Sequence, residues 1–379
     1  MQAKSIKGNT IEEVKTAFEQ CLSNGYKPTL AIVFLSIKQD REAVCTLLNK
    51  NGIAIFGATT SGEFINGETE EGSTVMMLLD MHPDHFRLEF LVTGSQTTIE
   101  NAKQIGLTGK NTFSNPAFII ASGWLSTDGE NIVEGITEGF GGDVTIFGGM
   151  AGDDLALTGP LVFTSGQSHT QGLLALIIDE DKIQINGIAT CGWKPIGTTK
   201  TVTKSEGNVV YTIDDKPALD MIIKYLGVED DFVSGKEIVS QLTALYPLQM
   251  ERDGVAPVMR TAMFANRVDR SLICAGNIAQ GSKVRFSLPP DFDAIEQVVE
   301  ECRQLKNECQ PEADALIMFS CISRRLSFGV LMREEIGQIQ ELWDAPLAGY
   351  FSYGEFGRSK TGKHEFHNNT CCVVALKEK

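Results

Sequence analysis

The sequence predicts an α/β fold of two domains, built from repeated strand–helix–strand units with mixed sheets and glycine-rich turns at strand ends. Short apolar runs alternate with segments of helical periodicity. The motif Gly-x4-Gly-Glu occurs at 57–63 and again at 349–355, and a copy with one residue fewer, ending in Asp, occurs at 148–153. Each copy follows a short apolar run, so one strand-and-turn unit is expected three times.

Composition limits the classes of function. The chain has 379 residues, a formal net charge of −16 and a sequence pI near 4.8. No basic stripe accompanies this acidity, so nucleic acid is not an expected partner. The N-terminus has no apolar core of the kind a secretory signal needs, and no apolar stretch approaches the length of a membrane span. The nine cysteines form no CxxC motif, so reduced thiols and a cytoplasmic location are expected.

The first unit is expected to begin with a helix over 11–22, because Thr10 and Glu13 form a capping box before apolar residues at helical spacing. The continuous apolar run 30–35 predicts a strand buried on both faces, and 41–50 predicts a helix leading to the first glycine turn. This order predicts a parallel pair of strands. The segments 74–79 and 86–91 are expected to complete the unit as strands.

The second unit is expected to repeat this order. Asp128 can cap a helix that precedes the second glycine turn. The other elements expected are a helix at 98–105, strands at 117–120, 161–163 and 172–178, and a hairpin over 198–213.

A new domain is expected after residue 213, because Pro217 suits the first turn of a helix that Gly227 ends. The predicted domains are therefore 1–213 and 214–379. The second is expected to contain strands at 258–264, 272–275 and 283–286, a long helix after Pro289-Pro290, a strand at 315–319, a helix at 326–342 and a final strand at 371–376.

Five motifs together resemble the FIST family, with a FIST N part followed by a FIST C part. They lie at 56–63, 147–153, 216–218, 349–355 and 366–370. The resemblance implies a sensory module of intracellular signal transduction that binds small ligands such as amino acids. It also implies an alternative, because some members are haem-binding nitric-oxide sensors that act on histidine kinases or on cyclic-di-GMP signalling.

The glycine turns are the predicted ligand site, because open α/β sheets bind ligands at the carboxyl ends of their strands. The acids Glu63, Asp153 and Glu355 can bind a ligand amine, or they can cap the backbone of the turns. Arg324 can bind a ligand carboxylate or pair with an acid. The residues predicted to bind the ligand are Thr59, Thr60, Ser61, Gly62, Glu63, Gly149, Gly152, Asp153, Arg324, Ser352, Tyr353, Gly354, Glu355, His367 and Asn368.

Other reactive side chains give weaker signals. The pairs His82/His85 and His364/His367 have a spacing that suits two metal ligands on a helix, but neither stretch has helical periodicity, so no metal is expected. Cys321 precedes two arginines, which can activate a thiol. No base partner for Cys321 and no phosphate-binding or hydrolase signature is found, so the chain is predicted not to be an enzyme. The alternative is an enzyme that uses Cys321 or Glu355 in catalysis.

The predicted function is a cytoplasmic sensor of a polar metabolite such as an amino acid, without a cofactor. In the alternative, haem would take an axial histidine, and His169 and His367 are the histidines nearest to the repeated turns. No output segment is evident, so the signal is expected to pass to a separate protein, such as a histidine kinase or a cyclic-di-GMP enzyme. Membrane insertion is not expected.

Overall fold

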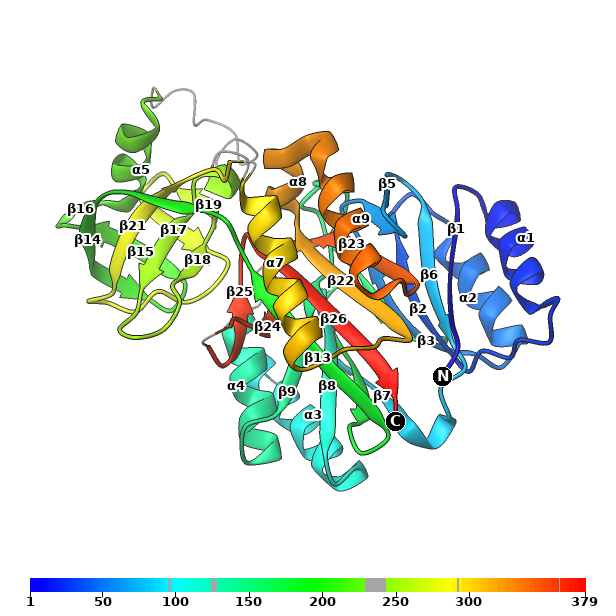
Figure 1. The fold of residues 1–379 in the computed structure, drawn as a ribbon. Helices are drawn as coiled ribbons and strands as arrows, with labels where there is room; N and C mark the ends of the chain where they lie inside the picture. Colours follow the sequence, from blue (N-terminus) through cyan, green and yellow to red (C-terminus); the bar gives the residue numbers. More distant parts are fainter. Residues whose placement is uncertain (95–96, 124–127, 229–242, 292, 361) are drawn as a thin grey trace.

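The computed structural model describes residues 1–94, 97–123, 128–228, 243–291, 293–360 and 362–379. It confirms an α/β fold with mixed sheets. Three six-stranded sheets and one further sheet, all with helices beside them, make up the molecule (Figure 1).

The first unit contains a parallel pair of strands and a hairpin after the glycine turn. Its elements are β1 (Ala3–Gly8), α1 (Ile11–Leu22), β2 (Leu30–Leu35), α2 (Arg41–Lys50), β3 (Ala54–Thr59), β4 (Glu63–Ile65), β5 (Glu68–Glu70) and β6 (Thr74–Leu79). The predicted parallel pairing of β2 with β3 is confirmed.

The second unit repeats this order after the short helix η1 (Pro83–His85). Its elements are β7 (Phe86–Val92), α3 (Thr98–Thr112), β8 (Pro116–Ser122), α4 (Gly129–Phe140), β9 (Thr145–Met150), β10 (Val162–Phe163), β11 (Ser168–His169) and β12 (Gly172–Asp179).

The third unit has the same order with an insertion after its first strand. Its elements are β13 (Ile183–Thr190), α7 (Asp293–Glu308), β22 (Ala315–Cys321), α8 (Ile322–Phe328), η3 (Gly329–Leu331), α9 (Met332–Trp343), β23 (Leu347–Ser352), β24 (Glu355–Arg358), β25 (His364–His367) and β26 (Cys371–Glu378).

The insertion forms the fourth sheet, which lies to one side of the three units (Figure 1). Its elements are β14 (Lys194–Glu206), β15 (Val209–Ile213), β16 (Lys216–Pro217), α5 (Ala218–Leu226), β17 (Leu248–Glu251), β18 (Val258–Arg260), β19 (Ala262–Asn266), β20 (Ser271–Cys274) and β21 (Lys283–Leu288). The hairpin predicted over 198–213 is confirmed as β14 and β15. The boundary predicted between 213 and 214 falls inside this insertion, at the end of β15.

The three units exchange their hairpins in a closed cycle. The sheet orders are β1-β6-β2-β3-β10-β11, β7-β12-β8-β9-β24-β25 and β13-β26-β22-β23-β4-β5. The hairpin β4-β5 of the first unit therefore completes the sheet of the third unit. The hairpin β24-β25 of the third unit completes the sheet of the second, and β10-β11 of the second completes that of the first. The expected threefold repetition is confirmed, and the exchange makes it a pseudo-threefold assembly within one chain.

Burial explains why these segments form strands. Every residue of β2, β6, β8, β22 and β23 is buried, as expected of strands covered on both faces. The sheets of the first and third units also pack on each other, since the ring of Phe34 lies 4.7 Å from that of Tyr350 and 6.1 Å from that of Phe319.

Local signals set the helix ends. Thr10 accepts a hydrogen bond from the Glu13 N–H at the start of α1, as predicted, but the Glu13 carboxylate accepts from Asn9 and not from Thr10. Asp128 accepts from the Glu130 N–H at the start of α4, which confirms the predicted cap. Gly227 ends α5 in the left-handed region, at φ 65°.

Three predictions about elements were wrong. The strand expected over 258–264 is two strands, β18 and β19, which pair with different neighbours. The strand β7 opens the second unit and pairs with β12, whereas it was expected to close the first unit. The helix expected over 326–342 is two helices, because Gly329 adopts φ 55° and ψ −123° between α8 and α9. The helix α3 also continues beyond the predicted end, to Thr112.

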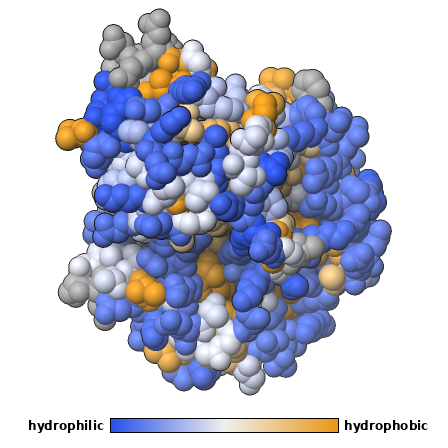
Figure 2. Space-filling view, turned by 90° about the vertical axis from the view of Figure 1, so that its left-hand side faces the viewer, coloured by the Kyte–Doolittle hydropathy of each residue, from blue (hydrophilic) through white to orange (hydrophobic). Residues whose placement is uncertain are grey.

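Figure 2 shows a mainly hydrophilic face on which hydrophobic residues form small scattered patches. Within the described residues, no helix combines the length and apolar character needed to span a membrane.

Candidate functional site

The three glycine turns meet and hydrogen-bond to one another around the pseudo-threefold axis. In each bond, a backbone N–H of one turn donates to a C=O of another turn, and in every turn the acceptor residue stands two positions before the donor residue. The bonds run from Ser61 to Phe351 (3.1 Å), from Gly152 to Thr59 (2.8 Å) and from Tyr353 to Met150 (3.3 Å). The turns therefore occupy equivalent ends of equivalent strands, as the repeated motif predicts.

Glu355 is a fully buried acid that ties its turn to the start of β26. Its carboxylate accepts a hydrogen bond from the Ser352 hydroxyl (2.6 Å) and two from the Thr370 hydroxyl and N–H (2.8 and 3.3 Å). Burial raises the pKa of Glu355 to about 8, although hydrogen bonds from Ser352, Thr370 and Cys321 oppose the shift.

Glu63 holds the equivalent place in the first unit. It accepts from the Thr60 hydroxyl and from the hydroxyl and N–H of Ser73 (2.9 and 3.1 Å), at the start of β6. Burial raises the pKa of Glu63 to about 7. Both glutamates are therefore placed as buried links between strands, with their oxygens occupied by hydroxyl and backbone donors.

Asp153 does not occupy the equivalent place, so its alignment with the two glutamates was wrong. Glu63 pairs with Tyr350 and Glu355 with Gly149, and the residue in the same register on the first sheet is Val162, opposite Ala58. A longer loop after β9 separates Asp153 from this position. Gly172 makes room for Val162, because a Cβ on Gly172 would lie 2.6 Å from Val162 Cγ2.

Asp153 instead organises the loop that follows β9. Its buried carboxylate accepts from the N–H groups of Leu157 (3.1 Å), Thr158 (2.7 Å) and Gly159 (2.9 Å). It also accepts from the Tyr353 hydroxyl (2.5 Å), which belongs to the third glycine turn. This is the capping role that the sequence left open beside ligand binding.

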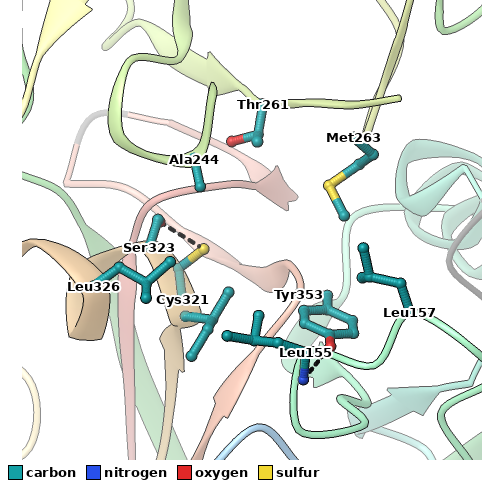
Figure 3. A pocket seen from close by; sticks show the side chains of 10 residues that line it. Leu155, Leu157, Ala244, Thr261, Met263, Cys321, Ser323, Leu326 and Tyr353 are labelled. Atoms are coloured by element: carbon teal, nitrogen blue, oxygen red, sulfur yellow. Dashed lines mark hydrogen bonds between the residues drawn. The ribbon is translucent and has the colours of Figure 1, made fainter. Parts of the chain in front are cut away.

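A partly open cavity lies at the carboxyl end of β22, beside these turns. Four separate parts of the chain line it: the loop after β9, the junction of β22 with α8, the insertion, and the third glycine turn with Tyr353 (Figure 3). Its lining residues are Leu155, Leu157, Ala244, Thr261, Met263, Cys321, Ile322, Ser323, Leu326 and Tyr353. Ligands commonly bind at the carboxyl ends of strands, so this cavity is the candidate functional site.

The polar groups of the cavity are three hydroxyls and one thiol. Ser323 donates to Cys321 Sγ (3.0 Å), a bond drawn in Figure 3. Thr261 donates to Asn369 Oδ1 (2.8 Å). Burial raises the pKa of Cys321 to about 12, so the thiol keeps its proton at neutral pH.

The structure brings few of the predicted binding residues to this cavity. Tyr353 lines it, and the predicted acids are not among its described lining residues. Arg324 is fully buried and paired with Glu335, itself fully buried. Asn368 accepts from the Thr261 N–H (3.4 Å). The sequence did not predict most of the lining residues, because apolar residues on a loop, a helix and an insertion share no pattern in sequence. Of the lining residues that were not predicted to bind the ligand, Cys321 alone had been considered, as a possible catalytic thiol.

The histidines considered for haem do not line the cavity. His367 is buried, its Nε2 lies 3.2 Å from the Gly357 carbonyl oxygen, and burial lowers its pKa to about 4. His169 is exposed. His82 and His85 lie in and beside the short helix η1, with rings 4.9 Å apart. Among the described residues, no group of three or more His, Cys, Asp or Glu side chains could hold a metal ion.

Comparison with known proteins gives the family. The FIST N domain matches residues 29–216 and the FIST C domain matches residues 218–358. No curated protein matches the chain in sequence. The two matches cover most of the chain and meet inside the insertion. The chain therefore belongs to the FIST family, whose domains are sensory domains of signal-transduction proteins.

Proposed function

We propose that this chain is a small-molecule sensor whose ligand occupies the cavity between the loop after β9, the β22–α8 junction and the insertion. The observation that carries the proposal is the shared lining. Leu157, Met263 and Leu326 come from three different parts of the chain and line one partly open pocket.

A ligand in this cavity can change how the insertion sits on the three units. It would contact Ala244 and Thr261 on one side and Ile322 and Leu326 on the other. A ligand shifts a conformational equilibrium only when it binds one arrangement more tightly, and a site shared by several parts of the chain meets that condition. Leu326 is 42% exposed, so α8 also reaches the surface, where a partner protein could read the change.

The proposed role is binding and not catalysis. Cys321 is the nucleophilic side chain of the cavity, and burial keeps its thiol protonated, so it lacks the thiolate that nucleophilic attack requires. The receiver of the signal is proposed to be a separate protein, such as a histidine kinase or a cyclic-di-GMP enzyme.

The proposal is tested by blocking the cavity. The protein purified from cells is analysed by native mass spectrometry and by its absorbance spectrum, and thermal shifts are measured with amino acids and with neutral aromatic compounds. A ligand at about 100 times its dissociation constant should stabilise the protein by about 2.7 kcal/mol.

The variant Leu326→Trp fills the cavity from α8 and should abolish this shift. Val330→Trp is the matched control, because Val330 is 84% exposed and lies outside the cavity lining. Binding that persists in Leu326→Trp, or a Soret band in the purified protein, would contradict the proposed site.

A further inference from the structure

The described residues that line the cavity carry no charged side chain. Six of its side chains are apolar, and none of the described residues that enclose it is an acid, an arginine, a lysine or a histidine. A zwitterionic amino acid leaves its ammonium and carboxylate without ionic partners in such a space, and burying an unpaired charge is very costly. The lining therefore favours a neutral ligand, in contrast to the polar metabolite expected from the sequence.

Thr261 can offer the ligand only a hydrogen-bond acceptor. The Asn369 amide nitrogen donates to the Ala244 carbonyl (2.7 Å), so its oxygen must face the Thr261 hydroxyl. The hydroxyl proton of Thr261 then points to Asn369 Oδ1 (2.8 Å). The remaining lone pairs of Thr261 Oγ1 are free to accept.

Ser323 can likewise offer the ligand only a hydrogen-bond acceptor. Its hydroxyl donates to Cys321 Sγ (3.0 Å), the thiol of a neighbouring lining residue. The proton of Ser323 thus points into the protein, and its oxygen keeps lone pairs for a ligand.

The Tyr353 hydroxyl already acts both as a hydrogen-bond donor and as an acceptor within the protein. Its hydroxyl donates to Asp153 (2.5 Å) and accepts from the Leu155 N–H (3.1 Å), a bond drawn in Figure 3. Among the hydroxyls of the described lining residues, those left for a ligand are therefore the acceptors Thr261 Oγ1 and Ser323 Oγ, which come from the insertion and from α8.

We infer that the ligand is a neutral, largely apolar molecule carrying a hydrogen-bond donor, an N–H or O–H group, which it directs to Thr261 or Ser323. This inference rests on the proposed function, since it assumes that the cavity binds a small molecule. Such a donor would link the insertion to α8 through the ligand.

The test compares two molecules of nearly the same shape. Indole carries an N–H donor and indene has a CH₂ group in its place. Benzoate represents an anion, and leucine represents a zwitterion. Dissociation constants are measured by calorimetry for the full chain. Indole is expected to bind several-fold to about tenfold more tightly than indene, the range of one net hydrogen bond, and benzoate and leucine are expected not to bind.

Thr261→Val and Ser323→Ala each remove one acceptor. The ratio of the indene to the indole dissociation constant should fall toward one in at least one of them. A purely structural loss would weaken both molecules alike and leave the ratio unchanged. Thr16→Val, at an exposed position on α1, is the matched control and should keep the wild-type ratio.

The outcomes separate the two proposals. Indene binding as tightly as indole, or benzoate or leucine binding more tightly than indole, would overturn the inferred ligand class, while loss of that binding in Leu326→Trp would still support the site. Binding of any of these molecules that is unchanged in Leu326→Trp would overturn the site itself. If none of the four binds the wild-type protein, the inferred class is also overturned.

Discussion

The Tyr353 hydroxyl donates a hydrogen bond to the Asp153 carboxylate over 2.5 Å, although the two residues are 200 positions apart. The bond joins the third glycine turn to the loop after β9. Asp153 accepts three backbone N–H groups of that loop as well, and the loop carries Leu155 and Leu157 into the cavity. The contact between two turns of the repeat therefore shapes one wall of the candidate site.

Removing this hydroxyl should weaken both the fold and the site. Tyr353→Phe leaves Asp153 with its backbone donors but without its phenol donor, and hydrogen bonds to charged groups contribute about 1.5 to 3 kcal/mol. Urea unfolding is expected to show a loss of this size, and indole is expected to bind more weakly because the loop is less ordered. Tyr211→Phe, on β15, is the control. Unchanged stability together with unchanged indole affinity would disprove this role.

The stability of the fold should depend on the protonation of Glu355. Its pKa is about 8 in the folded chain, because of burial, against 4.5 for the ordinary side chain. The folded state holds a proton that the unfolded state releases, so this contribution is complete below pH 4.5 and is lost as the pH rises toward 8. Glu63, with a pKa of about 7, acts in the same direction.

The variant Glu355→Gln isolates this effect, because it keeps the shape of the side chain and cannot titrate. The free energy of unfolding of the wild type minus that of the variant should decline between pH 5 and 8, with a slope approaching about 1.4 kcal/mol per pH unit. The buried histidines are present in both proteins and cancel. A difference that is constant across this range in urea unfolding would show that Glu355 is ionised in the folded protein.

Gly172 and Val162 should be energetically coupled. A Cβ at position 172 would lie 2.6 Å from Val162 Cγ2 and 3.0 Å from Phe90 Cζ, so Gly172→Ala should cost about 1 to 3 kcal/mol by overpacking. The cost should be smaller in a Val162→Ala background, which a double-mutant cycle measures. Gly166→Ala, whose Cβ would meet no atom within 4 Å, is the control. Equal costs in both backgrounds would contradict the coupling.

Arg324 should act as a structural partner of Glu335, in a fully buried pair. Arg324→Met leaves the Glu335 carboxylate buried and unpaired, at a cost of about 3 to 5 kcal/mol, and Arg324→Met with Glu335→Leu should recover most of it. Arg303→Met, which breaks the exposed pair with Glu300, should cost less than about 1 kcal/mol. A double variant less stable than either single variant would argue against this account of the pair.

Much of the fold could be predicted because it depends on local signals. The run 30–35 is apolar throughout and is the buried strand β2, and Asp128 caps α4 as its position suggests. Among the strands that were not predicted are β1, β4 and β5. Two are three residues long, and β1 is only partly buried, so none carries a strong pattern. Gly329 was passed over because a single glycine is tolerated within a helical pattern.

The sequence by itself determined the repeated unit, the family and the three glycine turns, because backbone conformation and strand burial depend on patterns among residues that are close in sequence. Only the tertiary structure decided which sheet each hairpin completes, that Val162 stands where Glu63 and Glu355 stand in their units, and where the cavity lies. These depend on contacts between residues a hundred or more positions apart, such as Asp153 with Tyr353. The physical reason is that burial and hydrogen bonding act through space, so a carboxylate next to a glycine can become a buried link in one unit and a loop cap in another.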